Sequence, residues 1–193
     1  MMTRGRYAVR RTVAVAASAL ALIGVSHAPA GAHLPRDQEV RDLVELAVAT
    51  APFHDVDAAL AAGWSVEPMC MDYPDGFHGE APGTMGNHFY NVAYLTDGGH
   101  IEPAQPELLL YEKRRDGGWR LNAVEYVIPA ADLPGTAEPP RLFGQEFRFY
   151  PEIGSAGIWG LHVWIWRHNP RGLYVNLNPR VSCEYADMTN TAQ

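Results

Sequence analysis

The segment LHVWIWRHNPRGLYVNLNPRVSC, residues 161–183, carries the densest pattern of the chain. At its start, imidazoles and indoles occupy every second position: His162, Trp164, Trp166 and His168. In an extended chain, alternate residues point to the same face. The residues between them are apolar except for Arg167, so we expect a β-strand that is buried on both sides.

Two turn signals divide the remainder of this segment. Asn-Pro steps at 169–170 and 178–179 favour turns. They bracket a short apolar run, so we expect a second strand over 173–177. The rest of the protein is then expected to form walls around this hairpin-like unit.

The first 32 residues have the composition of a secretory signal peptide. Arg4, Arg6, Arg10 and Arg11 precede an uncharged run over 12–25, and Ala30-Gly31-Ala32 provides a cleavage site. The run is shorter than the ~20 residues that a membrane span needs. We expect cleavage after Ala32, export without stable membrane insertion, and one globular domain over 33–193. An uncleaved N-terminal anchor is the alternative, and the pattern does not choose between the Sec and twin-arginine routes.

Removal of this leader makes the chain strongly acidic. The sequence holds 15 Lys and Arg, four of them in the leader, against 22 Asp and Glu, so the mature net charge is −11. Such a surface repels nucleic acid and anionic lipid, and we expect neither as a partner. It attracts cations and is compatible with a small-molecule ligand, but it says nothing about oligomeric state.

Cys70 and Cys183 are an even pair of cysteines in a chain that we expect to be exported. A disulfide between them is the natural interpretation. The alternative is a thiolate that binds metal or acts in catalysis. Neither cysteine belongs to a CxxC motif or has a histidine nearby in sequence, which favours the disulfide.

Helical patterns come first in the mature chain. Apolar residues recur at three- and four-residue intervals: Val40, Leu43, Val44, Ala47 and Val48. Pro35 and Asp37 favour the start of this helix, and Pro52 ends it. A second short helix is expected over 54–62, with Asp55 as its cap and Gly63 just beyond its end.

Short β patterns separated by turns follow the helices. Strands are expected over 86–96, 107–113, 119–129 and 143–150, ahead of the two strands in the final segment. Consecutive strands after two helices predict an α+β fold. In it, two N-terminal helices pack on a largely antiparallel sheet, which could close into a partial barrel.

One hairpin in this pattern predicts a pair of carboxylates. If Glu112 lies opposite Arg120, attractive charges meet at the loop end, and Glu107 lies opposite Glu125. Like charges at that spacing destabilise a sheet unless a cation, a proton or an arginine intervenes. A shift of one residue in the register removes this pairing.

Two histidines extend the carboxylate pair into a predicted metal site. His88 and His162 both lie in apolar strands, and a mixed set of imidazoles and carboxylates suits a divalent transition metal: Zn, Fe, Mn, Ni or Cu. We predict His88, Glu125 and His162 as ligands, with Glu107 as a fourth ligand or the catalytic general base. An open coordination position would allow metal-dependent catalysis.

Two other functions fit the same residues. The protein could be a non-enzymatic binding module, in which a pocket lined by Trp and Tyr takes an apolar or sugar ligand. It could also be a structural protein of the cell envelope, in which the histidines and Glu125 are satisfied internally and there is no site.

Several short motifs give the chain a likeness to known proteins. They are Met85-Gly86-Asn87-His88-Phe89-Tyr90-Asn91, Pro106-Glu107 with Leu110-Tyr111-Glu112, Val124-Glu125-Tyr126, Leu161-His162-Val163-Trp164 with Asn169-Pro170, and Asn178-Pro179-Arg180-Val181-Ser182-Cys183. With the helix around Asp55, this pattern resembles a family of small exported bacterial proteins of unassigned function. The resemblance spans nearly the whole mature chain. It implies a single exported domain and transfers no catalytic role.

Overall fold

The computed structural model describes residues 35–133, 135 and 138–191. The chain divides into two units between residues 32 and 33, and all of the described residues belong to the second, His33–Gln193. The predicted signal peptide and its cleavage site therefore lie outside the described residues. Among the residues that are described, no helix is long and apolar enough to cross a membrane.

Both predicted helices are present at the start of the second unit. Helix α1 spans Pro35–Thr50, a 3-10 turn η1 covers Ala51–His54, and α2 spans Val56–Ala61. Asp55 caps α2, because its side chain accepts a hydrogen bond of 3.0 Å from the backbone N–H of Asp57. Gly63 follows α2 with a φ of +101°, a conformation that glycine adopts without strain.

The buried face of α1 differs from the one that the valine spacing indicated. Val40, Val44 and Val48 are exposed, up to 72% for Val48, whereas Leu46 and Thr50 are fully buried. The hydroxyl of Thr50 accepts a hydrogen bond of 3.1 Å from the indole of Trp166. Helix α1 therefore packs against the rest of the domain through Leu46 and Thr50, and the three valines face outward.

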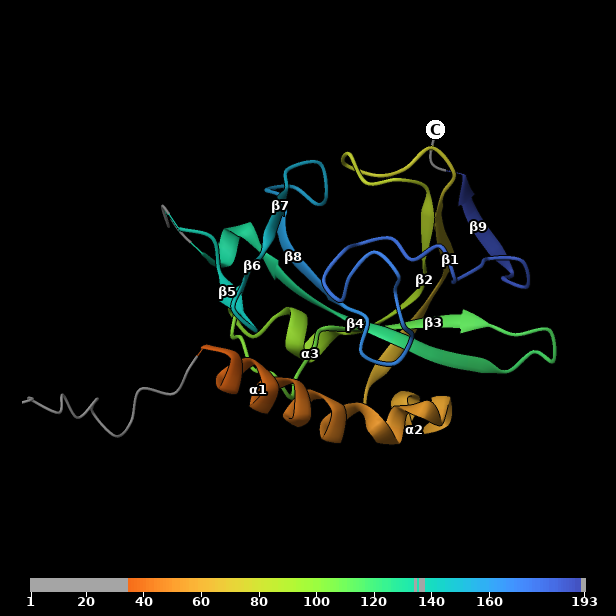
Figure 1. The fold of residues 1–193 in the computed structure, drawn as a ribbon, viewed down its shortest axis with the longest axis horizontal. Coiled ribbons are helices and arrows are strands. Elements are labelled where there is room, and N and C mark those ends of the chain that lie inside the picture. The colour runs from red at the N-terminus through yellow and green to blue at the C-terminus, as the bar shows by residue number, and fades with distance from the viewer. Residues whose placement is uncertain (1–34, 134, 136–137, 192–193) are drawn as a thin grey trace, which may run out of the picture. The chain divides into compact units, whose positions relative to one another are not determined.

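Seven strands form one curled sheet, a half-barrel, in the order β7-β8-β4-β3-β2-β1-β9 (Figure 1). The strands are β1 Trp64–Tyr73, β2 Gly83–Asn91, β3 Leu108–Lys113, β4 Trp119–Pro129, β7 Arg148–Tyr150, β8 Ile158–Val163 and β9 Met188–Thr191. Neighbours are antiparallel except β1 and β9. The predicted α+β class and largely antiparallel sheet are confirmed.

Smaller elements complete the domain. A single turn of helix, α3 Val92–Leu95, follows β2, and the 3-10 turn η2 Ala130–Asp132 follows β4. Strands β5 Arg141–Leu142 and β6 Gln145–Glu146 form a separate two-stranded hairpin. The strand expected over 143–150 is therefore divided between β6 and β7.

The hairpin expected within 161–183 is wrong. Strand β8 starts earlier and ends at Val163, and residues 173–177 lie in a loop. Trp164 leaves the sheet because its backbone N–H binds the carbonyl of Leu173 at 2.9 Å and its indole N–H binds that of Val175 at 2.6 Å. The buried indole finds its hydrogen-bond acceptor in the loop. The alternation of aromatic residues in the sequence therefore continues after the strand has ended.

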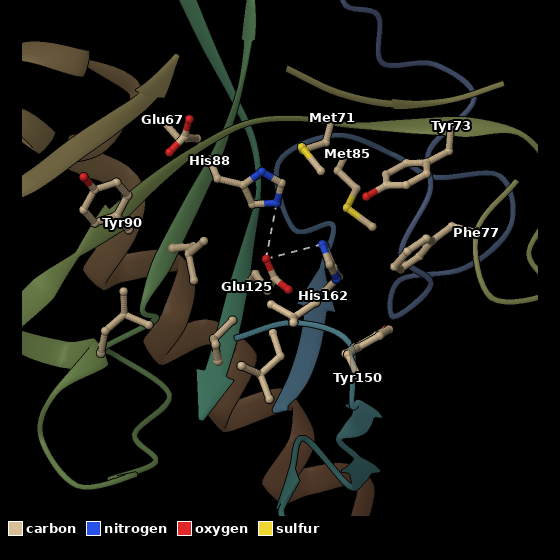
Figure 2. Close-up of a pocket in the computed structure, with 15 residues that line it drawn as sticks. Glu67, Met71, Tyr73, Phe77, Met85, His88, Tyr90, Glu125, Tyr150 and His162 are labelled. Atoms are coloured by element: carbon tan, nitrogen blue, oxygen red, sulfur yellow. Dashed lines mark ion pairs between the residues drawn. The ribbon is translucent and has the colours of Figure 1, made fainter. Parts of the chain in front are cut away.

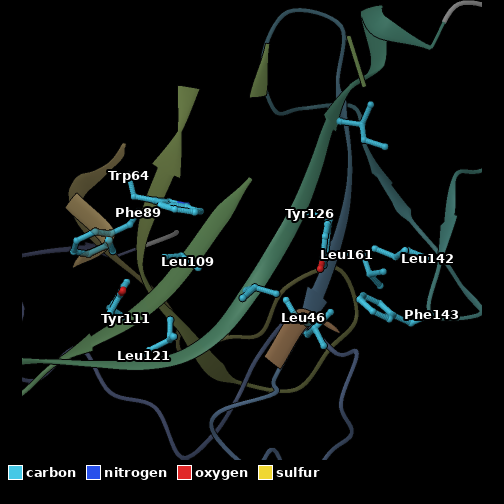
Figure 3. Close-up of a cluster of buried hydrophobic side chains, with 14 of the residues drawn as sticks. Leu46, Trp64, Phe89, Leu109, Tyr111, Leu121, Tyr126, Leu142, Phe143 and Leu161 are labelled. Carbon is cyan, nitrogen blue, oxygen red and sulfur yellow. The ribbon is translucent and has the colours of Figure 1, made fainter. Parts of the chain in front are cut away.

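The two faces of the sheet have different roles, one in the hydrophobic core and the other in the candidate site. One face carries the main hydrophobic cluster, which includes Leu46 of α1 and Ala59 of α2 (Figure 3). The strands contribute Phe89, Leu109, Tyr111, Leu121, Val124, Tyr126, Leu161 and Val163 to this cluster. Because side chains alternate along a strand, the residues between these face the other way. That second face holds the candidate site.

A disulfide joins the first long strand to the end of the chain. Cys70 of β1 and Cys183 are bonded, with a sequence separation of 113 residues. Cys70 is fully buried. This confirms the predicted pairing and fits a protein that folds in an oxidising compartment.

We predict that replacing both cysteines by serine lowers the free energy of unfolding by about 4–5 kcal/mol, because the cross-link closes a loop of more than a hundred residues. Urea unfolding followed by circular dichroism would measure the change. Reduced wild-type protein is the control and should match the double serine variant. Equal stability of the oxidised and reduced wild type would contradict this prediction.

Candidate metal centre

Strand pairing brings three of the four predicted site residues to one face of the sheet. Glu125 of β4 lies directly opposite His162 of β8. His88 of β2 is two strands away on the other side, where it pairs with Leu110 of the intervening β3. The curl of the sheet lets the long side chains from β2 and β4 meet across β3.

The carboxylate of Glu125 lies between the two imidazoles (Figure 2). Its Oε2 is 3.3 Å from Nε2 of His88 and 3.6 Å from Nε2 of His162. One donor atom from each of the three residues lies within 4.8 Å of the others, so this group could hold a metal ion. Mixed nitrogen and oxygen donors suit a divalent transition metal.

His162 is the least satisfied member of the group. It is only 2% exposed, and neither ring nitrogen has a hydrogen-bond partner among the described residues. Burial disfavours its charged form and lowers the pKa of His162, although the charge of Glu125 acts in the opposite direction. A neutral imidazole with a free lone pair is the form that binds a metal.

Glu125 is buried but remains an anion. Burial by itself would raise the pKa of Glu125, but the His162 and His88 imidazoles outweigh it and hold the pKa below its ordinary value. The site therefore combines a buried carboxylate with two imidazoles that favour its ionised form. A bound cation would serve the same purpose.

The three residues line a pocket of about 340 Å³. Apolar and aromatic side chains make up most of its wall: Met71, Tyr73, Phe77, Met85, Tyr90, Leu95, Leu108, Val127, Tyr150, Ile153 and Ile158, with Glu67 also lining it. Figure 2 shows Met71 and Met85 on the same side of the pocket as the two imidazoles. This composition is typical of a small-molecule site, with few polar groups set in an apolar wall.

A glycine leaves room for the carboxylate. Gly160 of β8 lies opposite Val127, and a Cβ there would be 3.4 Å from Oε1 of Glu125 and 3.1 Å from the ring of Tyr150. Both neighbours line the pocket. Trp159 thus places a large side chain on the core face of β8, whereas Gly160 places no side chain on the site face.

Glu107 is not part of this group, and its predicted position opposite Glu125 is wrong. Glu112 does pair with Arg120, but a bulge between Leu110 and Tyr111 leaves Asn122 as an extra residue on β4. Beyond the bulge, Leu108 lies opposite Glu125 instead. Glu107 does not line the pocket, so the catalytic role predicted for it remains a prediction.

Glu107 instead lies just before β3, where its side chain contacts the backbone of the neighbouring strand β4. Its Oε2 accepts a hydrogen bond of 2.9 Å from the N–H of Val127. The residue is 3% exposed, and burial raises the pKa of Glu107 from 4.5 to about 8 despite that hydrogen bond. It is a buried carboxyl that holds a proton at neutral pH.

Two parts of the pocket wall were not predicted from the sequence: strand β1 and the loop between β1 and β2. Met71 and Tyr73 lie on the site face of β1, and Phe77 follows in the loop before β2. The alternation of Met71 and Tyr73 is a usable signal, but no strand was expected over this part of the sequence. Trp164 and Trp166 do not line the pocket, so the expected Trp contribution to an aromatic wall is wrong.

Comparisons with models of protein families, with curated proteins and with solved structures found no match for this chain. The likeness to small exported proteins therefore remains a prediction from sequence motifs. Any function has to be argued from the geometry of the site itself.

We predict that Glu107→Gln changes how stability depends on pH. The folded state raises this pKa, so the stabilising contribution of the proton is complete below pH 4.5 and is lost as the pH rises through about 8. The amide cannot ionise, so at pH 9 the variant should be more stable than the wild type, by on the order of 5 kcal/mol. At pH 4.5 the two should be similar.

Urea unfolding of both proteins at several pH values, with chelator present, would measure this difference. Glu102→Gln removes an exposed carboxylate and is the matched control. A constant difference between Glu107→Gln and wild type from pH 4.5 to 9 would show that Glu107 is not protonated in the fold.

Proposed function

We propose that this protein binds a divalent transition metal through His88, Glu125 and His162. The observation that carries the proposal is the convergence of three donor atoms within 4.8 Å of one another, one of them from the buried, unpartnered imidazole of His162, 3.6 Å from the Glu125 carboxylate. A buried polar group without a hydrogen bond costs ~1–3 kcal/mol. A metal ion at this point gives the imidazole a partner and compensates the charge of Glu125 at the same time.

The coordination that we propose has an open position. Three protein ligands leave at least one further position on a four-coordinate ion, and catalytic zinc sites are built in this way. The three ligands also line the pocket. A molecule in the pocket therefore reaches the metal directly, which allows Lewis-acid chemistry on a small ligand.

We also propose that the protein acts outside the cytoplasm. The Cys70–Cys183 disulfide and the sequence pattern of the first 32 residues support export. In this setting the site would obtain its metal from the surrounding medium.

A metal-independent binding module is the second candidate. The observation in its favour is a group of aromatic rings at the pocket: Phe77 stacks on Tyr150 with ring centroids 5.7 Å apart, and Tyr73 lies 4.6 Å from Phe77. Such rings suit an apolar ligand. This candidate predicts that ligand binding is the same with and without chelator.

We predict that wild-type protein binds one equivalent of a divalent transition metal, and that Glu125→Gln and His162→Ala each weaken binding by roughly 100-fold or more, because each removes a ligand. Calorimetric titration with zinc, together with elemental analysis of natively purified protein, would measure this. Circular dichroism would establish that the variants fold.

His100→Ala is the matched control. His100 also has its Nε2 close to a carboxylate, at 3.2 Å from Glu102, but both side chains are largely exposed. The control should bind metal as tightly as the wild type. Less than a tenth of an equivalent of metal in the wild type, with no heat of zinc binding, would refute the proposed function.

A further inference from the structure

The ligand set fixes the charge of the proposed centre. Two neutral imidazoles and one carboxylate around a divalent ion leave a net charge of +1. The ligands are largely buried, with the Glu125 side chain 9% exposed and that of His88 13% exposed. An uncompensated charge in such surroundings is costly.

The guanidinium closest to this wall, among the contacts described, is that of Arg148, which lies 6.0 Å from the ring centroid of Tyr150 and is paired with Glu80. Among the described residues that line it, none is Lys or Arg, and the only carboxylate besides Glu125 is the exposed Glu67. The Tyr150 hydroxyl already donates to Asn176 at 2.9 Å. A metal at the three ligands would therefore be the main positive charge that an anion in this pocket meets.

The apolar lining of the pocket favours an anion whose remaining part is apolar. Phe77, Tyr73 and Tyr150 line the pocket as a group of rings, and Figure 2 shows the Tyr73 ring projecting toward Met85. The thioethers of Met71 and Met85 add soft, polarisable surface. A volume of about 340 Å³ lies at the lower end of the ~300–1,000 Å³ range of small-molecule pockets, which is room for one substituted ring.

We propose that the site takes a small monoanion with an apolar, ring-sized body, such as an aryl carboxylate or a phenolate, whose oxygen occupies the open position of the metal. This inference rests on the proposed metal centre. The anionic oxygen brings the net charge to zero, and the ring fills the wall formed by Phe77 and its neighbours. Without metal, the Glu125 carboxylate repels the same anion.

Benzoate, acetate and benzamide separate the two requirements, charge and ring. Calorimetry would measure the binding of each to zinc-loaded protein and to protein stripped by chelator. We expect benzoate to bind the loaded form at least ~10-fold more tightly than the stripped form. In the loaded form we expect it to exceed acetate, which lacks the ring, and benzamide, which lacks the charge, by a similar factor.

A pair of phenylalanine variants tests the position of the ring. Phe77→Ala should weaken benzoate binding to the loaded protein roughly 5-fold or more and leave acetate and zinc binding unchanged. Phe149→Ala is the control, because Phe149 is 41% exposed and does not line the pocket. It should leave all three affinities unchanged.

The outcomes distinguish this inference from the proposed function. If zinc does not bind, both fail. If zinc binds but benzoate has the same affinity with and without it, or binds no better than acetate or benzamide, only the ligand class proposed here is refuted. An unchanged benzoate affinity in Phe77→Ala would also count against it.

Discussion

The compensation of one buried carboxylate governs the site face of this protein. Glu125 is 7% exposed in the middle of the longest strand, and it stays ionised only because two imidazoles lie within 3.6 Å of its Oε2. A buried carboxylate with backbone hydrogen bonds but no imidazole partner takes up a proton instead, as Glu107 does nearby, with a pKa of about 8. Two glutamates close to the same part of the sheet thus have opposite protonation states, and the difference comes from their neighbours.

The sequence was sufficient for the parts of the site that depend on strand alternation. His162 and Glu125 each lie between two residues of the main cluster, and His88 precedes Phe89 of that cluster, so period-two spacing assigns all three to the opposite face. Their convergence across β3 also required the strand order and the curl of the sheet. Neither follows from local pattern, because both depend on which strands pair over long distances in the sequence.

The failures of prediction arise where a single residue or a side-chain hydrogen bond changes the backbone. The bulge at Asn122 separates Glu107 from the row of Glu125, and a lone asparagine within an apolar run is too weak a signal to locate it. The end of β8 at Val163 follows from the acceptors that the Trp164 indole and backbone find in the loop. An alternating pattern in the sequence indicates which residues are buried. It does not indicate whether the backbone that carries them is extended.

An unsatisfied buried group is weak evidence for a ligand site when it stands alone. Asn122 is fully buried and both of its side-chain polar atoms lack partners in the described part of the chain, as does the indole N–H of Trp64. Neither belongs to a group of potential metal ligands, and neither lines the pocket. His162 differs because a carboxylate, a second imidazole and an apolar pocket all meet at its ring. Convergence of several chemically matched donors on one point, rather than the missing hydrogen bond, is what distinguishes a metal centre from a local imperfection of packing.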